Sequence, residues 1–247
     1  MNNKICMFRQ PAGLGDIFFL QKAAYKYHEI GYDIIWPILD NFLFLKDYIT
    51  TPYIKFYSEK EDFPFKEVYI SNPNKCVGYD DNFLYIPFQH ADRIHPEEKL
   101  LHSKYKLIDL DCSDWASYFK FERNLTRENK LYYDILKLSD DTKYNFINSN
   151  YGSFPNSVVH PDVHSKENED ILTITMDKID TDDYSDNVFD WLKVIENASN
   201  IYSVDTSIMY LMESISLKAD NLELWSRFGS HKFDHITGLY AKKYNYN

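Results

Sequence analysis

Short apolar runs alternate along this chain with longer runs in which apolar residues recur every three or four positions. Continuous apolar runs are typical of strands buried on both faces, and the three- to four-residue period is typical of helices that bury one face. In the first half, the pattern predicts helices at residues 16–30 and near 96–107, and strands at residues 5–8, 33–37, 53–57, 67–70 and 83–87. Because strands and helices alternate, we expect an α/β fold with largely parallel sheets.

The second half repeats this alternation after a polar run, Ser-Asp-Asp-Thr-Lys, at residues 139–143. A helix at 126–138, with Thr126 as its N-cap, is predicted before the polar run, and helices at 188–198 and 207–217 are predicted after it. The strands expected beyond the run lie at residues 144–149, 171–176, 200–204 and 222–225. Residues 150–170 show no clear period and are predicted to form a long loop.

The polar run at 139–143 also predicts a division into two domains. We place an N-terminal domain at residues 1–140 and a C-terminal domain at residues 141–247. The tail from residue 228 onward is rich in aromatic residues, histidines and lysines. We expect this tail either to pack back on the first domain or to lie loose.

Composition narrows the class of protein. With 247 residues, of which 44% are hydrophobic, the chain is large enough to bury a core, and its net charge of −11 opposes attraction to nucleic acid. No run approaches the roughly 18 apolar residues of a membrane-spanning helix, so we expect no transmembrane segment, while peripheral contact with a membrane stays compatible with the sequence. The cysteines Cys6, Cys76 and Cys112 form no CxxC pair, which favours a reduced, cytoplasmic setting.

A glycine-rich turn, Arg9-Gln-Pro-Ala-Gly13-Leu-Gly15-Asp16, joins the first predicted strand to the first predicted helix. Turns of this kind bring the backbone close to a ligand at the mouth of an α/β sheet. Phe18 stands where the dinucleotide fingerprint GxGxxG has its third glycine, which argues against a Rossmann-type oxidoreductase. The Asp16 carboxylate would also repel a pyrophosphate at the same helix start. Asp16 therefore either caps its helix or serves as a general base at the mouth of the sheet.

The segment Asp205-Thr206-Ser207 follows an apolar predicted strand and precedes an apolar helical run. Two hydroxyls and the free amides of a helix start can receive an anion such as a diphosphate. The same pattern also fits an ordinary capped helix that packs its apolar face on the core. Both interpretations are open from this segment alone.

Together, the two segments resemble the heptosyltransferase-type inverting glycosyltransferases, which have the GT-B fold. Asp16 matches the aspartate of that family's early GD turn, and residues 189–198 resemble the helix before the family's later motif. That motif reads D-[S/T]-G-P-[M/V]-H-L, and this chain matches it at Asp205, Thr206, Met209 and Leu211. The chain departs from the family pattern at Lys22, Ser207, Ile208 and Tyr210.

The resemblance implies two Rossmann-like domains whose parallel sheets face a central cleft. It implies that Asp16 deprotonates the acceptor hydroxyl and that Gly13, Gly15 and Arg9 belong to an acceptor-side loop, in which Arg9 either faces the leaving diphosphate or is exposed. The residues expected to bind the donor diphosphate are Asp205, Thr206 and Ser207. The loop that contains Ser149, Gly152 and Ser153 is either a further phosphate contact or a plain surface turn.

The partners implied by the resemblance are a nucleotide-diphosphate sugar and a glycan, lipid-linked or protein acceptor. We expect transfer with inversion at the anomeric carbon and with neither a metal nor a resident cofactor, since helix amides and hydroxyls can stabilise the leaving diphosphate. The alternative is a catalytically silent nucleotide-sugar or glycan-binding module with the same fold.

Two further patterns are compatible with metal binding. The DxD pattern of the GT-A glycosyltransferases occurs as Asp109-Leu-Asp111 and Asp180-Thr-Asp182, but such matches are expected by chance among 38 acidic residues. The i,i+4 histidine spacing that suits zinc on a helix occurs at His160 and His164 and at His231 and His235. Pro161 argues against a helix at the first pair, and neither pair has the HExxH glutamate. We therefore predict no metal site.

Overall fold

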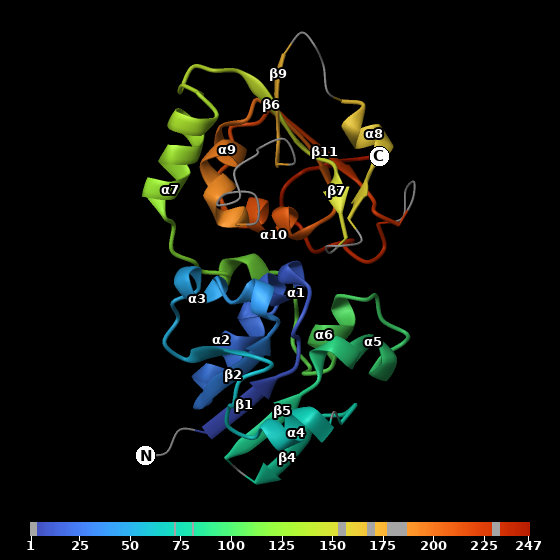
Figure 1. Ribbon diagram of the computed structural model, residues 1–247. Coiled ribbons are helices and arrows are strands. Elements are labelled where there is room, and N and C mark those ends of the chain that lie inside the picture. The colour runs from blue at the N-terminus through green and yellow to red at the C-terminus, as the bar shows by residue number, and fades with distance from the viewer. Residues whose placement is uncertain are drawn as a thin grey trace. The chain divides into compact units, whose positions relative to one another are not determined.

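The computed structural model describes residues 4–71, 73–80, 82–152, 157–166, 171–176, 187–228 and 233–247. The chain divides into two compact units: the first comprises Met1–Glu122 and Asp234–Leu239, and the second comprises Arg123–Phe233 and Tyr240–Asn247 (Figure 1). Residues 123–140 therefore belong with the second unit, whereas the predicted boundary places them with the first. The C-terminal tail contributes Asp234–Leu239 to the first unit, and its remaining residues belong to the second.

A five-stranded sheet in the order β3-β2-β1-β5-β4 forms the centre of the first unit. The parallel strands are β1 (Lys4–Phe8), β2 (Tyr32–Ile38), β3 (Ile54–Ser58) and β5 (Phe83–Ile86). They confirm the strands predicted at residues 5–8, 33–37, 53–57 and 83–87. The edge strand β4 (Val77–Asp80), which was not predicted, pairs antiparallel with β5.

The first unit contains short helices around this sheet. The α-helices are α1 (Leu14–Phe19), α2 (Gln21–Glu29), α3 (Leu45–Tyr48), α4 (Lys66–Ser71), α5 (Ala91–Ile94) and α6 (His102–Lys106). Single 3-10 turns are η1 (Asp40–Phe42), η2 (Phe88–His90) and η3 (Trp115–Ser117). The helix predicted near residues 96–107 is thus confined to its last turns.

The helix predicted at residues 16–30 is broken at Leu20, where φ is −82° and ψ is 3°. The side-chain amide of Gln21 donates a hydrogen bond of 3.0 Å to the carbonyl of Ile17. In a continuous helix the backbone N–H of Gln21 would bond to that carbonyl. The side chain therefore replaces the backbone bond, and α1 and α2 form two separate helices.

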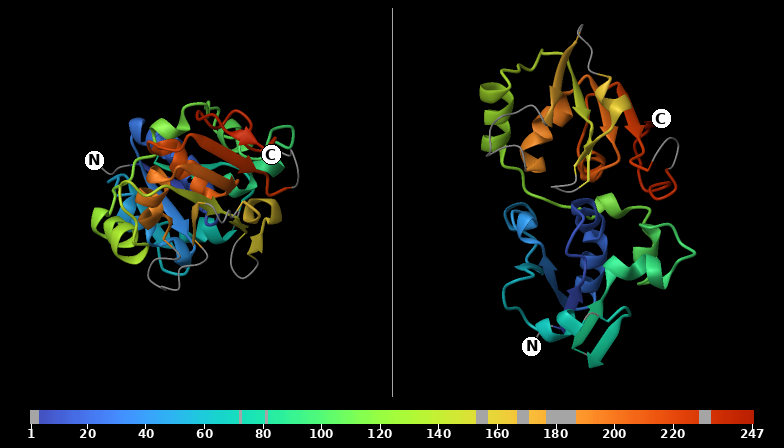
Figure 2. Two further views of the ribbon diagram at one scale, coloured as in Figure 1. Left: turned by 90° about the horizontal axis from the view of Figure 1, so that it is seen from above. Right: turned by 45° about the vertical axis from the view of Figure 1, so that its right-hand side comes forward.

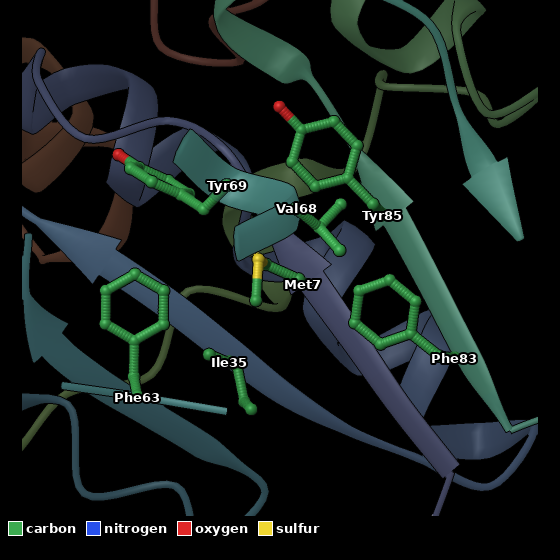
Figure 3. Close-up of a cluster of buried hydrophobic side chains, with 7 residues drawn as sticks. All are labelled: Met7, Ile35, Phe63, Val68, Tyr69, Phe83 and Tyr85. Atoms are coloured by element: carbon green, nitrogen blue, oxygen red, sulfur yellow. The ribbon is translucent and has the colours of Figure 1, made fainter. Parts of the chain in front are cut away.

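The strand predicted at residues 67–70 is wrong, because this segment is the helix α4. Val68 and Tyr69, which are consecutive, are both buried and belong to a core cluster that includes Met7 and Phe83, whereas Ile70 is 70% exposed (Figure 3). Consecutive residues of a strand point to opposite faces, so only a helix allows Val68 and Tyr69 to pack together on one side. Packing against the sheet overrides the β-propensity of Val-Tyr-Ile.

Both faces of the first sheet are covered. Met7 packs under α4, while its neighbour Phe8 makes edge-to-face ring contacts with Tyr27 of α2 and with Trp36, at centroid distances of 6.1 and 5.1 Å. The buried Trp36 indole donates to the Gln10 carbonyl at 3.0 Å. This alternation along β1 explains why its sequence is apolar at successive positions.

The second unit contains a five-stranded sheet in the order β12-β11-β10-β6-β9. Its strands are β6 (Tyr144–Asn148), β9 (Leu172–Thr175), β10 (Asn200–Val204), β11 (Asn221–Trp225) and β12 (Asn245–Tyr246), and each strand pairs in parallel with its neighbours. The four strands predicted at residues 144–149, 171–176, 200–204 and 222–225 are confirmed. With the first sheet, they confirm the predicted α/β class with two largely parallel sheets.

The helices of the second unit lie on both faces of its sheet. They are α7 (Leu125–Asn129), which continues as a π-helical segment (Lys130–Ile135), α8 (Pro161–His164), a 3-10 turn η6 (Val188–Trp191) that leads into α9 (Leu192–Asn197), and α10 (Ser207–Ser214). Phe146 contacts Trp191 at a centroid distance of 6.2 Å, whereas its neighbour Ile147 packs with Val163 of α8. The two views of Figure 2 likewise show α8 and α9 on opposite faces.

Three predictions for the second unit need correction. The helix predicted at 126–138 begins one residue earlier, because Asn124 rather than Thr126 is the cap: its side-chain oxygen accepts from the Arg127 N–H at 3.1 Å. The long loop predicted at 150–170 instead contains α8 and a hairpin of β7 (Asn150–Tyr151) and β8 (Val158–Val159) in its described part. Pro161 occupies the first position of α8, where a proline has no hydrogen bond to lose, so it begins a helix rather than preventing one.

None of the helices in the described part of the chain combines the length and the apolar character needed to cross a membrane.

Candidate active site

Asp16 lies in the first turn of α1, which the turn at residues 9–13 connects to the carboxyl end of β1. Gly13 precedes this helix with φ at 83°, in the left-handed region that favours glycine, and Gly15 is the second residue of the helix. Ligand sites of parallel α/β sheets lie at the carboxyl ends of the strands. The turn therefore places a carboxylate where a substrate is expected.

The buried side chain of Lys104, on α6, approaches Asp16. Lys104 Nζ lies 3.3 Å from Asp16 Oδ1, and it also donates to Gln10 Oε1 at 2.6 Å and to the Phe88 carbonyl at 3.2 Å. The Lys104 side chain is 6% exposed and that of Asp16 is 27% exposed. The ammonium thus has one ion-pair partner and two hydrogen-bond acceptors, so the buried charge is both paired and hydrogen-bonded.

Lys104 is a candidate site residue that was not predicted from the sequence. The available signal was its spacing: it follows the buried Leu101 by three residues and therefore lies on the face of α6 that packs inward. A lysine at such a position is buried only when it has a partner. That this partner is Asp16, 88 positions earlier in the chain, cannot be read from the sequence.

The second oxygen of Asp16 lies over Gly13. A Cβ atom added to Gly13 would be only 2.2 Å from Asp16 Oδ2, a separation that real Cβ atoms essentially never show. Ala12 and Gly13 are exposed. Because Gly13 has no side chain, Asp16 Oδ2 can occupy the space that a Cβ atom would fill.

Arg9 is partly buried, and its guanidinium contacts Tyr69. Its guanidinium lies 4.1 Å from the centre of the Tyr69 ring and Nη1 donates to the Tyr69 carbonyl. The Tyr69 hydroxyl in turn donates to Glu59. In Figure 3, the hydroxyl ends of Tyr69 and Tyr85 both point away from Ile35. Burial raises the pKa of Tyr85, and the positive charge of Arg9 partly offsets this effect.

In the second unit, Asp205 follows β10 and is 3% exposed. Its Oδ1 accepts from the backbone N–H of Arg227 at 2.8 Å, and the Arg227 Nε lies 4.0 Å away. The Asp205 N–H donates to the Trp225 carbonyl at 3.0 Å. Asp205 thus joins the ends of β10 and β11. Through these contacts, the Asp205 side chain organises this edge of the sheet.

Thr206 is the N-cap residue of α10, in extended conformation, but its hydroxyl does not cap the helix. Thr206 Oγ1 instead accepts from Asn148 Nδ2 at 2.9 Å, and the same Asn148 nitrogen donates to Ser203 Oγ at 2.9 Å. The first amides of a helix have no partner within the helix. The backbone amides of Ser207 and Ile208 are therefore not capped by the Thr206 side chain.

The structure brings Ser149 to the same edge of the sheet as Asp205. Asn148 pairs in register with Ser203, so the residues that follow them leave adjacent parallel strands together. Ser149 is 2% exposed, and its carbonyl accepts from the His160 N–H at 2.9 Å. Gly152 follows β7 with φ at 90°. Ser153 lies outside the described residues.

Several buried polar atoms near this edge have no hydrogen-bond partner in the described part of the chain: Asn150 Oδ1, His160 Nδ1 and Thr175 Oγ1. Thr175 ends β9, pairs with Ile147 and is 5% exposed. Buried polar groups normally find partners. Unpartnered groups beside Ser149 are consistent with a site that a ligand completes.

The DxD pattern in the first unit has structural partners. Asp111 Oδ2 accepts from the Ser113 N–H at 3.2 Å and from its hydroxyl, which holds the pKa of Asp111 below its ordinary value. The Asp111 carbonyl accepts from the buried Lys22 at 2.5 Å, and Lys22 also pairs with Asp114. Asp180 and Asp182 lie outside the described residues, as does His231. Among the residues described, no three His, Cys, Asp or Glu side chains are grouped so that they could hold a metal ion.

No model of a known protein family matches the chain, and no curated protein matches it. The solved structures that are similar to it include three of glycosyltransferases. The glycosyl transferase family 9 protein from Veillonella parvula DSM 2008 is 10% identical, with 92% of this chain and 81% of that chain covered and a TM-score of 0.49.

The other two are structures of TibC. The bacterial iron-containing dodecameric glycosyltransferase TibC from enterotoxigenic E. coli H10407 is 9% identical, with 96% of this chain covered and a TM-score of 0.45. The iron-containing heptosyltransferase TibC in complex with ADP-D-beta-D-heptose is 10% identical, with 96% covered and a TM-score of 0.41. This chain spans 65% of each TibC chain. Each of these three structures is of a protein named as a glycosyltransferase or a heptosyltransferase.

Proposed function

We propose that the chain is a glycosyltransferase that moves a sugar from a nucleotide-diphosphate donor to a hydroxyl of a glycan, lipid-linked or protein acceptor. One observation carries the proposal: Asp16 Oδ1 lies 3.3 Å from the buried Lys104 ammonium, while Oδ2 lies over the bare Cα of Gly13. A general base must be held in place and must also be open to the proton that it takes. Asp16 meets both requirements.

In the proposed reaction, the Asp16 carboxylate takes the proton of the acceptor hydroxyl while the acceptor oxygen forms a bond to the anomeric carbon. The bond from that carbon to the diphosphate oxygen breaks on the opposite face, and its electron pair leaves with the nucleoside diphosphate. Attack and departure on opposite faces invert the configuration of the sugar. One base is sufficient, because no covalent enzyme intermediate forms.

We place the donor diphosphate at the carboxyl edge of the second sheet. The hydroxyls of Thr206 and Ser207 and the first amides of α10 are the groups that would stabilise the leaving charge without a metal. Asp205 would hold this turn through Arg227. The unpartnered Thr175 hydroxyl supports a ligand at this edge, and Ser149, Gly152 and Ser153 are proposed as further contacts.

A nucleotide panel combined with a transfer assay tests the proposal. The panel contains nucleoside diphosphates and their sugars, including ADP-D-beta-D-heptose, which is present in one similar structure. We expect at least one nucleoside diphosphate to raise the melting temperature, and we expect its sugar to be transferred or slowly hydrolysed in the presence of a metal chelator.

The variant Asp16→Asn should lose transfer and keep nucleotide binding. Asp47→Asn is the matched control, because Asp47 is exposed on the short helix α3 of the same unit, and it should keep both properties. Unchanged turnover in Asp16→Asn would exclude Asp16 as the base. Binding without transfer or hydrolysis would favour the silent binding module, and a panel without any binding would overturn the proposal.

A further inference from the structure

Lys104 holds the glycine-rich turn at two points. Its ammonium forms an ion pair with Asp16 Oδ1 at one end of the turn and donates a hydrogen bond to Gln10 Oε1 at the other. The Gln10 side-chain amide donates across the turn to the Ala12 carbonyl at 2.5 Å. The Gln10 carbonyl is fixed independently by the Trp36 indole. One buried lysine thus connects α6 to the whole segment from Gln10 to Asp16.

The two oxygens of Asp16 have different surroundings. Oδ1 faces the Lys104 ammonium, and Oδ2 lies over Gly13, which is exposed. A short aspartate side chain has few rotamers, and an ion pair with a buried lysine that is held by Gln10 and the Phe88 carbonyl selects among them. The oxygen that faces the ammonium is engaged, so the other one is the oxygen that a hydroxyl can approach.

We infer that Lys104 is a positioning residue for Asp16: it fixes Oδ1 and the turn, and it leaves Oδ2 as the oxygen that accepts the proton. This inference rests on the proposed function, because it assigns Asp16 the role of base. A purely structural role would be to anchor α6 on the sheet through the Phe88 carbonyl, which lies 3.2 Å from Lys104 Nζ. The two roles predict different effects of a Lys104 substitution on transfer when Asp16 is also replaced.

The experiment compares Lys104→Met, Lys104→Arg and Lys106→Met in transfer assays, alone and combined with Asp16→Asn. Lys106 is on the same helix and is exposed, so Lys106→Met is the matched control. We expect Lys104→Met to lower kcat about 100-fold, as a misplaced catalytic group does, with the KM for the donor changed less than about threefold. Lys104→Arg should recover part of the loss, since it keeps the charge but not the geometry.

In the Asp16→Asn background, Lys104→Met should have no further effect on the residual rate, because the base that it positions is missing. An equal loss in both backgrounds would show that Lys104 acts on the fold and would overturn the inference. A kcat for Lys104→Met within about threefold of that for Lys106→Met would also overturn it.

A second measurement separates this inference from the proposed function. If the wild-type protein transfers no sugar from any donor, the proposed function fails. The amide resonances of Gly13 and Gly15 then test separately whether Lys104 fixes the turn. We expect these resonances to shift in Lys104→Met and to stay in place in Lys106→Met. Unchanged resonances in Lys104→Met would overturn the inference whether or not transfer is observed.

Discussion

The side-chain amide of Asn148, at the end of β6, donates a 2.9 Å hydrogen bond to the hydroxyl of Thr206, the residue that precedes α10. The same nitrogen donates to Ser203 on the neighbouring strand. The turn that we propose for the donor diphosphate is therefore tied to the adjacent strand of the sheet. Its geometry depends on a residue 58 positions earlier in the chain.

The variant Asn148→Ala removes the hydrogen bond to Thr206. We expect the affinity for a nucleoside diphosphate to fall about tenfold, which corresponds to about 1.4 kcal/mol, because the Thr206 hydroxyl loses its donor. Calorimetric titration measures the affinity. Asn145→Ala is the control: Asn145 lies at the other end of the same strand and accepts from Asn200 at 2.8 Å. It should lose stability without losing affinity, and an equal loss of affinity in both variants would contradict the prediction.

Gly13→Ala introduces both backbone strain and a collision. A residue with a side chain at φ 83° costs about 1–2 kcal/mol, and the new Cβ would lie 2.2 Å from Asp16 Oδ2. Gly31→Ala separates the two effects, because Gly31 has φ 94° and nothing within 4 Å of an added Cβ. Urea unfolding should show a larger loss for Gly13→Ala, and transfer should fall only in that variant. Similar behaviour of the two variants would show that the Asp16 side chain moves aside freely.

The stability of the protein should decrease at acidic pH through His90. Burial lowers the pKa of His90 below its ordinary value of 6.5, and the charges of Arg93 and Arg9 lower it further. The unfolded chain therefore binds a proton near pH 6.5 that the folded chain resists, so the free energy of unfolding falls as the pH drops from 6.5 toward the folded pKa, by at most about 1.4 kcal/mol per pH unit. Urea unfolding of the wild type and His90→Asn measures this at about pH 7.5 and pH 5.5. The variant should lose less stability on acidification, and parallel losses would refute the assignment.

Glu213 should fix the end of the chain. Its Oε2 accepts from the Ala241 N–H at 2.7 Å and the Lys242 N–H at 3.3 Å, and its Oε1 accepts from the Tyr244 hydroxyl at 2.7 Å. Hydrogen bonds to a charged group each contribute about 1.5–3 kcal/mol, so Glu213→Ala should release residues 241–247 and increase their hydrogen exchange. Glu213→Gln retains one acceptor oxygen and should give an intermediate effect. Exchange rates at these residues that match the wild type would show that strand β12 alone holds the tail.

The pattern of apolar residues predicted most strands of both sheets. The strand at residues 200–204 has the same bounds in the structure, β10 (Asn200–Val204). Parallel strands buried on both faces need apolar residues at nearly every position, and this requirement is visible in the sequence. The edge strand β4 contains Gly78 and Asp80 and has no such run, so it could not be recognised in this way.

Local sequence was less informative where packing decides between two conformations. Val68 and Tyr69 favour a strand by propensity, and they are helical because one face of α4 covers Met7. Pro161 is unfavourable inside a helix but favourable at its first position, and only the position of the helix start distinguishes the two cases.

The sequence by itself determined the α/β class, the two groups of parallel strands and the segments around Asp16 and Asp205, because these depend on periodicity and on residues close together in the chain. Only the tertiary structure decided which groups face those segments. Lys104 reaches Asp16, and Asn148 reaches Thr206, through contacts between residues 88 and 58 positions apart. A hydrogen bond or an ion pair depends on distances of a few ångströms, which are set by how helices and strands pack and not by their order in the chain.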